Sequence, residues 1–194
     1  MRKSVIVQND VELENNIKLI KTRYALEVVR DEIIKLLILA LLFILLGYKE
    51  EFFFAITFLF AIRIFSGGMH MKSNIGCFVM SFCFLFLPIV LLPQLHIPDY
   101  ALLLIAGFSF LTISVLSPVA SYKRPIKTAS RKTFLKRMTL IVVFIECVVL
   151  AILWVNGSLE YFVVCVWVVS IQAIQLCATW TFRKQKGKND VKKI

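Results

Sequence analysis

The sequence predicts an all-α fold: a polytopic membrane bundle of six transmembrane helices, with an amphipathic interfacial helix before them. Hydrophobic residues make up 59% of the 194 residues, whereas soluble domains have roughly 45–50%, and the mean hydropathy is +0.82. Six apolar runs alternate with polar or proline-containing segments. The formal net charge is +11. Because the basic residues lie at the ends of apolar runs, this charge indicates membrane topology and lipid contact, with no nucleic-acid partner expected.

Residues 1–32 are predicted to form a cytoplasmic or interfacial N-terminal segment. Between Asn9 and Glu32, apolar residues recur at three- and four-residue spacing, which places them on one face of a helix. They are Leu13, Ile17, Ile20, Tyr24 and Val28. Such a helix either lies in the membrane interface or packs against the rest of the protein or a partner.

The membrane-embedded domain is expected to occupy residues 33–182, followed by a basic cytoplasmic tail over 183–194. Its first two apolar runs, Ile33–Leu46 and Phe52–Phe65, are short for a bilayer, which requires roughly 17–25 residues per helix. They either span the membrane or form a shallow hairpin, and we favour spanning helices. Four longer runs follow, at residues 75–92, 100–117, 138–155 and 159–182.

The distribution of Lys and Arg predicts the orientation. Six spans make three connections on one side, near Lys49, His96 and Gly157. Of the 23 Lys and Arg residues, only Lys49 lies in these connections. Since cytoplasmic loops carry the excess of basic residues, both termini and the segment 63–77 are expected on the cytoplasmic side.

The segment 63–77 contains the chemistry of the chain, because a His and a Cys lie there among three glycines. A thiolate with a nearby imidazole base is the arrangement that cysteine nucleophiles use. Cys77 falls at the start of the third run, where Ser73 or Asn74 is expected to cap a helix and the helix dipole favours an anion. The alternative for Cys77 is a small apolar filler residue.

His70 precedes Cys77 by seven residues, so a straight helix would separate them by about 10.5 Å along its axis. Proton transfer requires about 3 Å or one bridging water. A catalytic pair therefore requires a break in the helix, and Gly67-Gly68 is the expected place.

Three other kinds of polar residue lie in the apolar runs. Arg63 either snorkels, binds a substrate carboxylate or phosphate, or holds the catalytic turn. Glu146 is a functional candidate because a carboxylate is costly inside a membrane, and it either pairs with Arg63 or is protonated. Gln172 and Gln175 are expected to hold helices together. With two histidines and no Cys-x-x-Cys spacing, no metal site and no cofactor are expected.

The basic stretch from Lys123 to Arg137 has the charge to bind an acidic peptide or anionic lipid. The alternative is a topology signal alone. The residues proposed to bind substrate are Lys123, Arg124, Lys127, Arg131 and Lys132.

Arg63, the Gly67-Gly68 pair, His70 and Cys77, lying between apolar runs, resemble the motif of the accessory gene regulator B (AgrB) family. These are bacterial membrane cysteine endopeptidases that process quorum-sensing propeptides. The stretch from Ser117 to Ile126 is similar to the Pro-Ile loop of that family.

The resemblance implies that Cys77 attacks a peptide bond of a small AgrD-like propeptide, with His70 as the base and Arg63, Gly67 and Gly68 supporting the site. The peptide bound in the acyl-enzyme would then be released as a cyclic thiolactone or lactone. The implied location is the bacterial cell membrane, with lipids, the propeptide and a second copy of the chain as partners. Two competing functions are a non-catalytic membrane transport or scaffold protein and a purely hydrolytic membrane cysteine protease.

Overall fold

The computed structural model describes residues 2–68, 73–119 and 128–191. Every regular element among them is helical, which confirms the all-α prediction. The chain divides into two compact units, Met1–Leu46 and Gly47–Ile194.

The first unit consists of one helix, α1 (Arg2–Leu45). The predicted amphipathic helix and the first apolar run are therefore continuous. No Gly or Pro lies between residues 2 and 45, so nothing in the sequence ends the helix before Gly47, whose φ of 86° favours glycine. The predicted boundary after residue 32 falls inside this helix, and the division into an interfacial and a membrane part stays a prediction.

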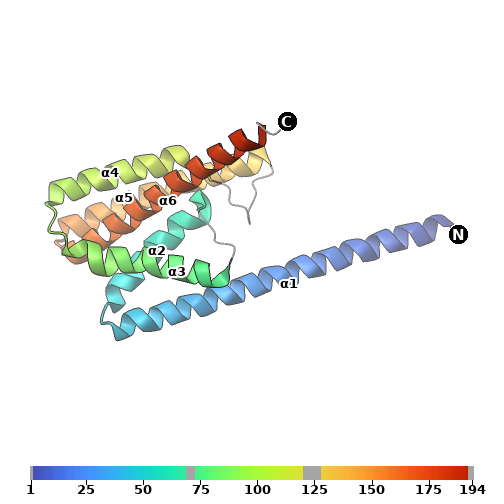
Figure 1. Ribbon diagram of the computed structural model, residues 1–194, viewed down its shortest axis with the longest axis horizontal. Helices are drawn as coiled ribbons and strands as arrows, with labels where there is room; N and C mark the ends of the chain where they lie inside the picture. The colour runs from blue at the N-terminus through green and yellow to red at the C-terminus, as the bar shows by residue number, and fades with distance from the viewer. Residues whose placement is uncertain (1, 69–72, 120–127, 192–194) are drawn as a thin grey trace. The chain divides into compact units, whose positions relative to one another are not determined.

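The second unit is a helical bundle (Figure 1). It contains α2 (Lys49–Ser66), α3 (Asn74–Phe86), α4 (Asp99–Leu116), α5 (Ala129–Val155) and α6 (Leu159–Val191). Figure 1 shows α4, α5 and α6 side by side, and α6 packs against both α4 and α2. The α6 span is 67% buried, whereas the other three spans are 17% to 28% buried. The bundle is thus built around α6.

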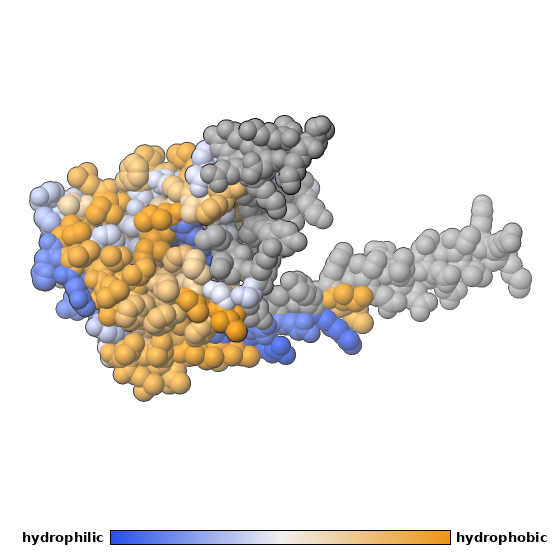
Figure 2. All heavy atoms as spheres, viewed as in Figure 1, coloured by the Kyte–Doolittle hydropathy of each residue, from blue (hydrophilic) through white to orange (hydrophobic). Residues whose placement is uncertain are grey.

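Within the described residues, four segments are long and apolar enough to cross a membrane: Ile75–Gln94, Asp99–Leu116, Ala129–Val155 and Leu159–Phe182. Apolar residues cover most of the visible face of the bundle, as a lipid-facing surface requires (Figure 2). A membrane protein is therefore confirmed, and the count of six spans stays a prediction.

Proline shapes the third span. The sequence predicts one apolar run over residues 75–92, but α3 ends at Phe86 and continues as a π-helical turn, Leu87–Leu91, and a 3-10 turn, Leu92–Gln94. Pro88 has no N–H to donate to the preceding turn, so the regular α-helical pattern ends there. The N–H of Leu92 instead donates to the carbonyl of Leu87, five residues back.

The fifth span also differs from the expectation. The apolar run begins at Met138, but α5 begins at Ala129, where the Thr128 hydroxyl accepts a hydrogen bond from the Arg131 N–H at 3.4 Å. Arg131, Lys132 and Lys136 are therefore helical residues, not loop residues.

Polar contacts join helices at two places in the bundle. Near the start of both helices, Tyr161 of α6 donates a hydrogen bond to Glu50 of α2 and stacks on Phe54, with ring centroids 4.6 Å apart. Further along α6, the hydroxyl of Ser109 of α4 donates to that of Ser170 at 3.1 Å. These contacts hold α6 against α2 and α4.

Candidate active site

Cys77 lies in the first turns of α3, half-buried, with its backbone held at the helix start. The Ser73 hydroxyl accepts a hydrogen bond from the Gly76 N–H at 3.0 Å, which confirms the predicted cap. The Cys77 N–H donates to the Ser73 carbonyl at 3.1 Å. One turn later, the Ser81 hydroxyl donates to the Cys77 carbonyl at 2.9 Å. The backbone of Cys77 is thus fixed at the start of α3 by its hydrogen bonds with Ser73 and Ser81.

The segment between Arg63 and Cys77 is not one straight helix. α2 ends at Ser66 and α3 begins at Asn74, so the break that a catalytic pair requires is present. Gly67 adopts φ of 82°, and its N–H donates to the Arg63 carbonyl at 3.2 Å. His70 lies outside the described residues.

Gly67 packs against a second chain segment, which enters from the end of α4. The Val119 N–H donates to the Ser66 carbonyl at 2.9 Å, and Gly67 and Val119 form a parallel β-bridge. A Cβ atom on Gly67 would lie 2.2 Å from the Val119 carbonyl oxygen. Only glycine satisfies both the backbone angle and this approach.

A third element, α6, also reaches this turn. The carboxamide Nε2 of Gln172 donates to the Ser66 hydroxyl at 3.2 Å and to the Gly67 carbonyl at 3.1 Å. The prediction that Gln172 holds helices together is confirmed. Its partner is the glycine turn of the site, which sequence reasoning missed because the two residues lie 105 positions apart.

Lys136 of α5 supports the same region from another side. Its ammonium group donates to the carbonyls of Ser114, Val115 and Ser117, the last at 3.0 Å. A lysine in this position satisfies the unpaired carbonyls at the end of α4. In the sequence, Lys136 is part of the basic stretch from Lys123 to Arg137, for which binding of an acidic peptide or anionic lipid, or a topology signal, is expected, so this role was missed.

The sequence profile of the family Accessory gene regulator B (AgrB) matches residues 3–176. This chain belongs to the AgrB family.

Two curated relatives agree with this assignment. The Accessory gene regulator protein B of Staphylococcus carnosus (strain TM300) is 32% identical over 136 residues, which cover 66% of each chain. An AgrB-like protein of Clostridium beijerinckii is 28% identical over 125 residues, covering 63% of this chain and 60% of its own. The match thus covers less than two thirds of the length of each relative. No solved structure matches it.

Arg63 lies near the end of α2, beside α3. Its guanidinium group is 5.8 Å from the centre of the Phe84 ring, a cation–π contact. Phe84 follows Cys77 by seven residues, so both lie on one face of α3, about 10 Å apart along the axis. Arg63 therefore packs along the Cys77 face of α3, which is consistent with its place in the AgrB-like motif.

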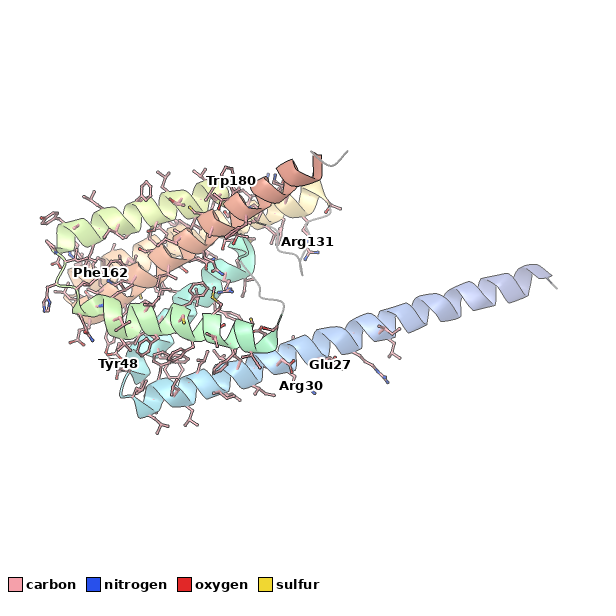
Figure 3. The ribbon with its side chains drawn as sticks, in the orientation of Figure 1. Glu27, Arg30, Tyr48, Arg131, Phe162 and Trp180 are labelled. Carbon is pink, nitrogen blue, oxygen red and sulfur yellow. The ribbon has the colours of Figure 1, made fainter. Side chains whose placement is uncertain are left out.

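Two of the five basic residues proposed to bind substrate can be placed. Arg131 and Lys132 are exposed in the first turn of α5, and Figure 3 shows Arg131 at the end of the bundle opposite Phe162. Lys123, Arg124 and Lys127 lie outside the described residues.

Glu146 is buried in the middle of α5, with 4% of its surface exposed. Neither carboxylate oxygen has a hydrogen-bond partner within the described ranges, so the suggested pairing with Arg63 is not formed there. No group of three His, Cys, Asp or Glu residues that could hold a metal ion occurs in the described part of the AgrB-family chain.

Proposed function

We propose that this AgrB-family protein is a membrane cysteine endopeptidase and peptide cyclase, acting on a small AgrD-like propeptide in quorum sensing. The observation that carries the proposal is the position of Cys77, half-buried and capped at the start of α3 directly after the glycine break. Family membership supports the same conclusion. The proposed nucleophile is Cys77, and the proposed base is His70.

In the first step, His70 takes the thiol proton and Cys77 Sγ adds to the carbonyl carbon of the scissile peptide bond. The C–N bond then breaks, and the departing amine receives the proton from His70. The N-terminal part of the propeptide remains attached to Cys77 as a thioester, and its C-terminal part leaves.

In the second step, a thiol or hydroxyl group within the bound peptide gives its proton to His70 and attacks the thioester carbonyl. The bond to Cys77 Sγ breaks, Cys77 regains its proton, and a cyclic thiolactone or lactone is released. Because hydrolysis of the thioester is strongly downhill, the site has to exclude water and hold the second nucleophile close. A position at a membrane surface meets both requirements.

The remaining residues of the motif have supporting roles in this proposal. Gly67 and Gly68 provide the turn, and Arg63 packs along the Cys77 face of α3. Arg131 and Lys132 are exposed at the start of α5 and, with Lys123, Arg124 and Lys127, attract the acidic part of the propeptide. The site and both termini lie on the cytoplasmic side, where the positive-inside rule puts the basic residues.

The test is reconstitution of the purified protein in lipid vesicles with a synthetic propeptide, followed by mass spectrometry. A cyclase releases a product one water lighter than the linear peptide, whereas a hydrolytic protease releases the linear peptide alone. A transport or scaffold protein leaves the propeptide uncut.

A further inference from the structure

Two carboxamide side chains of α6 are almost fully buried. Gln172 is 1% exposed and Gln175 is 3% exposed, in a helix that is otherwise mostly apolar where it crosses the bundle. An amide in an apolar interior is costly unless it forms hydrogen bonds. The Nε2 group of Gln172 bonds to Ser66 and Gly67, so the cost of burying this half of the amide is offset at the turn that precedes the candidate site. The Oε1 atom has no hydrogen-bond partner among the described residues.

The orientation of the Gln172 carboxamide follows from the chemistry of its partners. A backbone carbonyl can only accept, so the group that faces the Gly67 oxygen at 3.1 Å must be the NH₂ group. The Ser66 hydroxyl accepts from the same NH₂ group and lies 3.3 Å from the Gly67 carbonyl, to which it donates. The Gly67 oxygen is thus held by two donors, one from α6 and one from α2.

Holding this oxygen restricts the chain direction. The peptide group is planar, so two hydrogen bonds to the Gly67 oxygen fix the plane of the Gly67–Gly68 peptide. Consecutive glycines otherwise have the widest choice of backbone angles in the chain. Gly68 also lies beside α6, since a Cβ atom there would be in ordinary van der Waals contact with the amide of Gln175, 3.4 Å away.

We propose that Gln172 is a positioning residue of the active site: its carboxamide holds Ser66 and Gly67 and so sets the direction in which the chain leaves α2 toward the catalytic segment. This inference rests on the proposed function, since what it positions is the cysteine peptidase site. Gln172 touches neither the substrate nor the thiol in this account and acts through the backbone of the turn.

The experiment compares two variants of the full-length protein in lipid vesicles. Gln172→Leu keeps the size of the side chain and removes both hydrogen bonds. Ser170→Ala is the matched control, because it also removes a buried interhelical hydrogen bond of α6, the 3.1 Å bond with Ser109, but leaves the turn untouched. Three quantities are measured: the melting temperature, hydrogen–deuterium exchange of the peptide that contains Ser66–Gly68, and the rate of acyl-enzyme formation against propeptide concentration.

The positioning role predicts faster exchange over Ser66–Gly68 in Gln172→Leu and wild-type exchange there in Ser170→Ala. It also predicts a maximal acylation rate lower by about 10-fold to 100-fold, the scale expected for a small displacement of reacting groups. The propeptide concentration at half-maximal rate should stay unchanged. Ser66→Ala leaves the hydrogen bond from Gln172 to Gly67 in place. It should therefore reduce the maximal acylation rate less than Gln172→Leu does.

Two results would overturn the inference: acylation at the wild-type maximal rate in Gln172→Leu, or an equal loss of rate in Ser170→Ala. Failure of the proposed function is a different result, because the wild-type protein itself would then form no acyl adduct. The exchange data would in that case still show whether Gln172 holds the turn.

Discussion

Gly67 and Val119 approach so closely that a Cβ atom on Gly67 would lie 2.2 Å from the Val119 carbonyl oxygen. The contact brings the end of α2 against the chain that leaves α4, and the hydrogen bond from Val119 to Ser66 reinforces it. Gln172 and Lys136 hold these two segments from α6 and α5. The turn after α2, located between Arg63 and Cys77, is thus held by Gln172 of α6 and by the chain that follows α4, which Lys136 of α5 supports in turn.

Gly67→Ala should therefore prevent stable folding of this turn and abolish processing. An alanine at positive φ costs roughly 1–2 kcal/mol, and forcing a methyl group into a packed site costs a further 1–3 kcal/mol, approximately. Thermal unfolding of the purified protein would measure the sum.

Gly157→Ala is the matched control, because Gly157 has φ of 73° but nothing within 4 Å of its Cβ position. The Gly157→Ala protein should be destabilised only by the positive backbone angle, without the cost of a steric clash, and it should keep its activity. Equal destabilisation of the two variants would mean that the Val119 contact contributes nothing.

Lys136→Met should lower stability by about 1.5–3 kcal/mol, the usual range for hydrogen bonds to a charged group. The methionine keeps most of the apolar stem but leaves the carbonyls at the end of α4 without their donor. Arg137→Met removes an exposed charge from the next position and should change stability by no more than about 0.5 kcal/mol. Chemical denaturation of both variants measures the change in the free energy of unfolding. If Lys136 were only a topology charge, Lys136→Met and Arg137→Met would lower stability by equal and small amounts.

Arg131→Glu should raise the propeptide concentration required for half-maximal acylation, if the start of α5 attracts an acidic peptide. The effect should shrink with added salt, because the screening length falls from about 30 Å at 0.01 M to about 3 Å at 1 M. Lys49→Glu makes the same charge change at the start of α2. It should leave the half-maximal concentration as it is in the wild type, and an equal rise there would refute a local role for Arg131.

The orientation predicts which engineered cysteines an impermeant maleimide can reach in intact cells. In a chain with its native cysteines replaced by alanine, Asn156→Cys should be labelled from outside, because Asn156 lies in the turn before α6. Ser130→Cys, at the start of α5, should be labelled only after the membrane is opened. The reverse pattern would place the site outside the cell.

Much of the fold could be predicted from short-range features of the sequence. Gly47, Pro118 and Gly157 mark ends of helices because each disfavours a further helical turn, and the helices stop near them. The four longer apolar runs locate four candidate spans, since their length and composition are what a bilayer requires. Where the prediction differs from the structure, a local feature was underweighted: Pro88 disrupts α3, and the capping residue Thr128 starts α5 well before its apolar run.

The site was only partly accessible to sequence reasoning. The cap by Ser73 and the break at the glycine pair depend on neighbouring residues, so they could be predicted. The meeting of Gly67 with Val119 and Gln172 depends on how three distant segments pack, and no local pattern encodes it. A buried glutamine in an apolar helix was the available signal: it indicated that a partner exists but not which one.

The most direct test of the central claim is whether Cys77 becomes acylated by the propeptide. The wild-type protein, mixed with an AgrD-like propeptide whose internal Cys or Ser has been replaced by Ala, should accumulate a thioester on Cys77, detectable by mass spectrometry and sensitive to hydroxylamine. Cys77→Ala should form no adduct, whereas Cys83→Ala, changed at an exposed cysteine later in α3, should form it as the wild type does. Cleavage of the propeptide by Cys77→Ala at the wild-type rate would contradict the account.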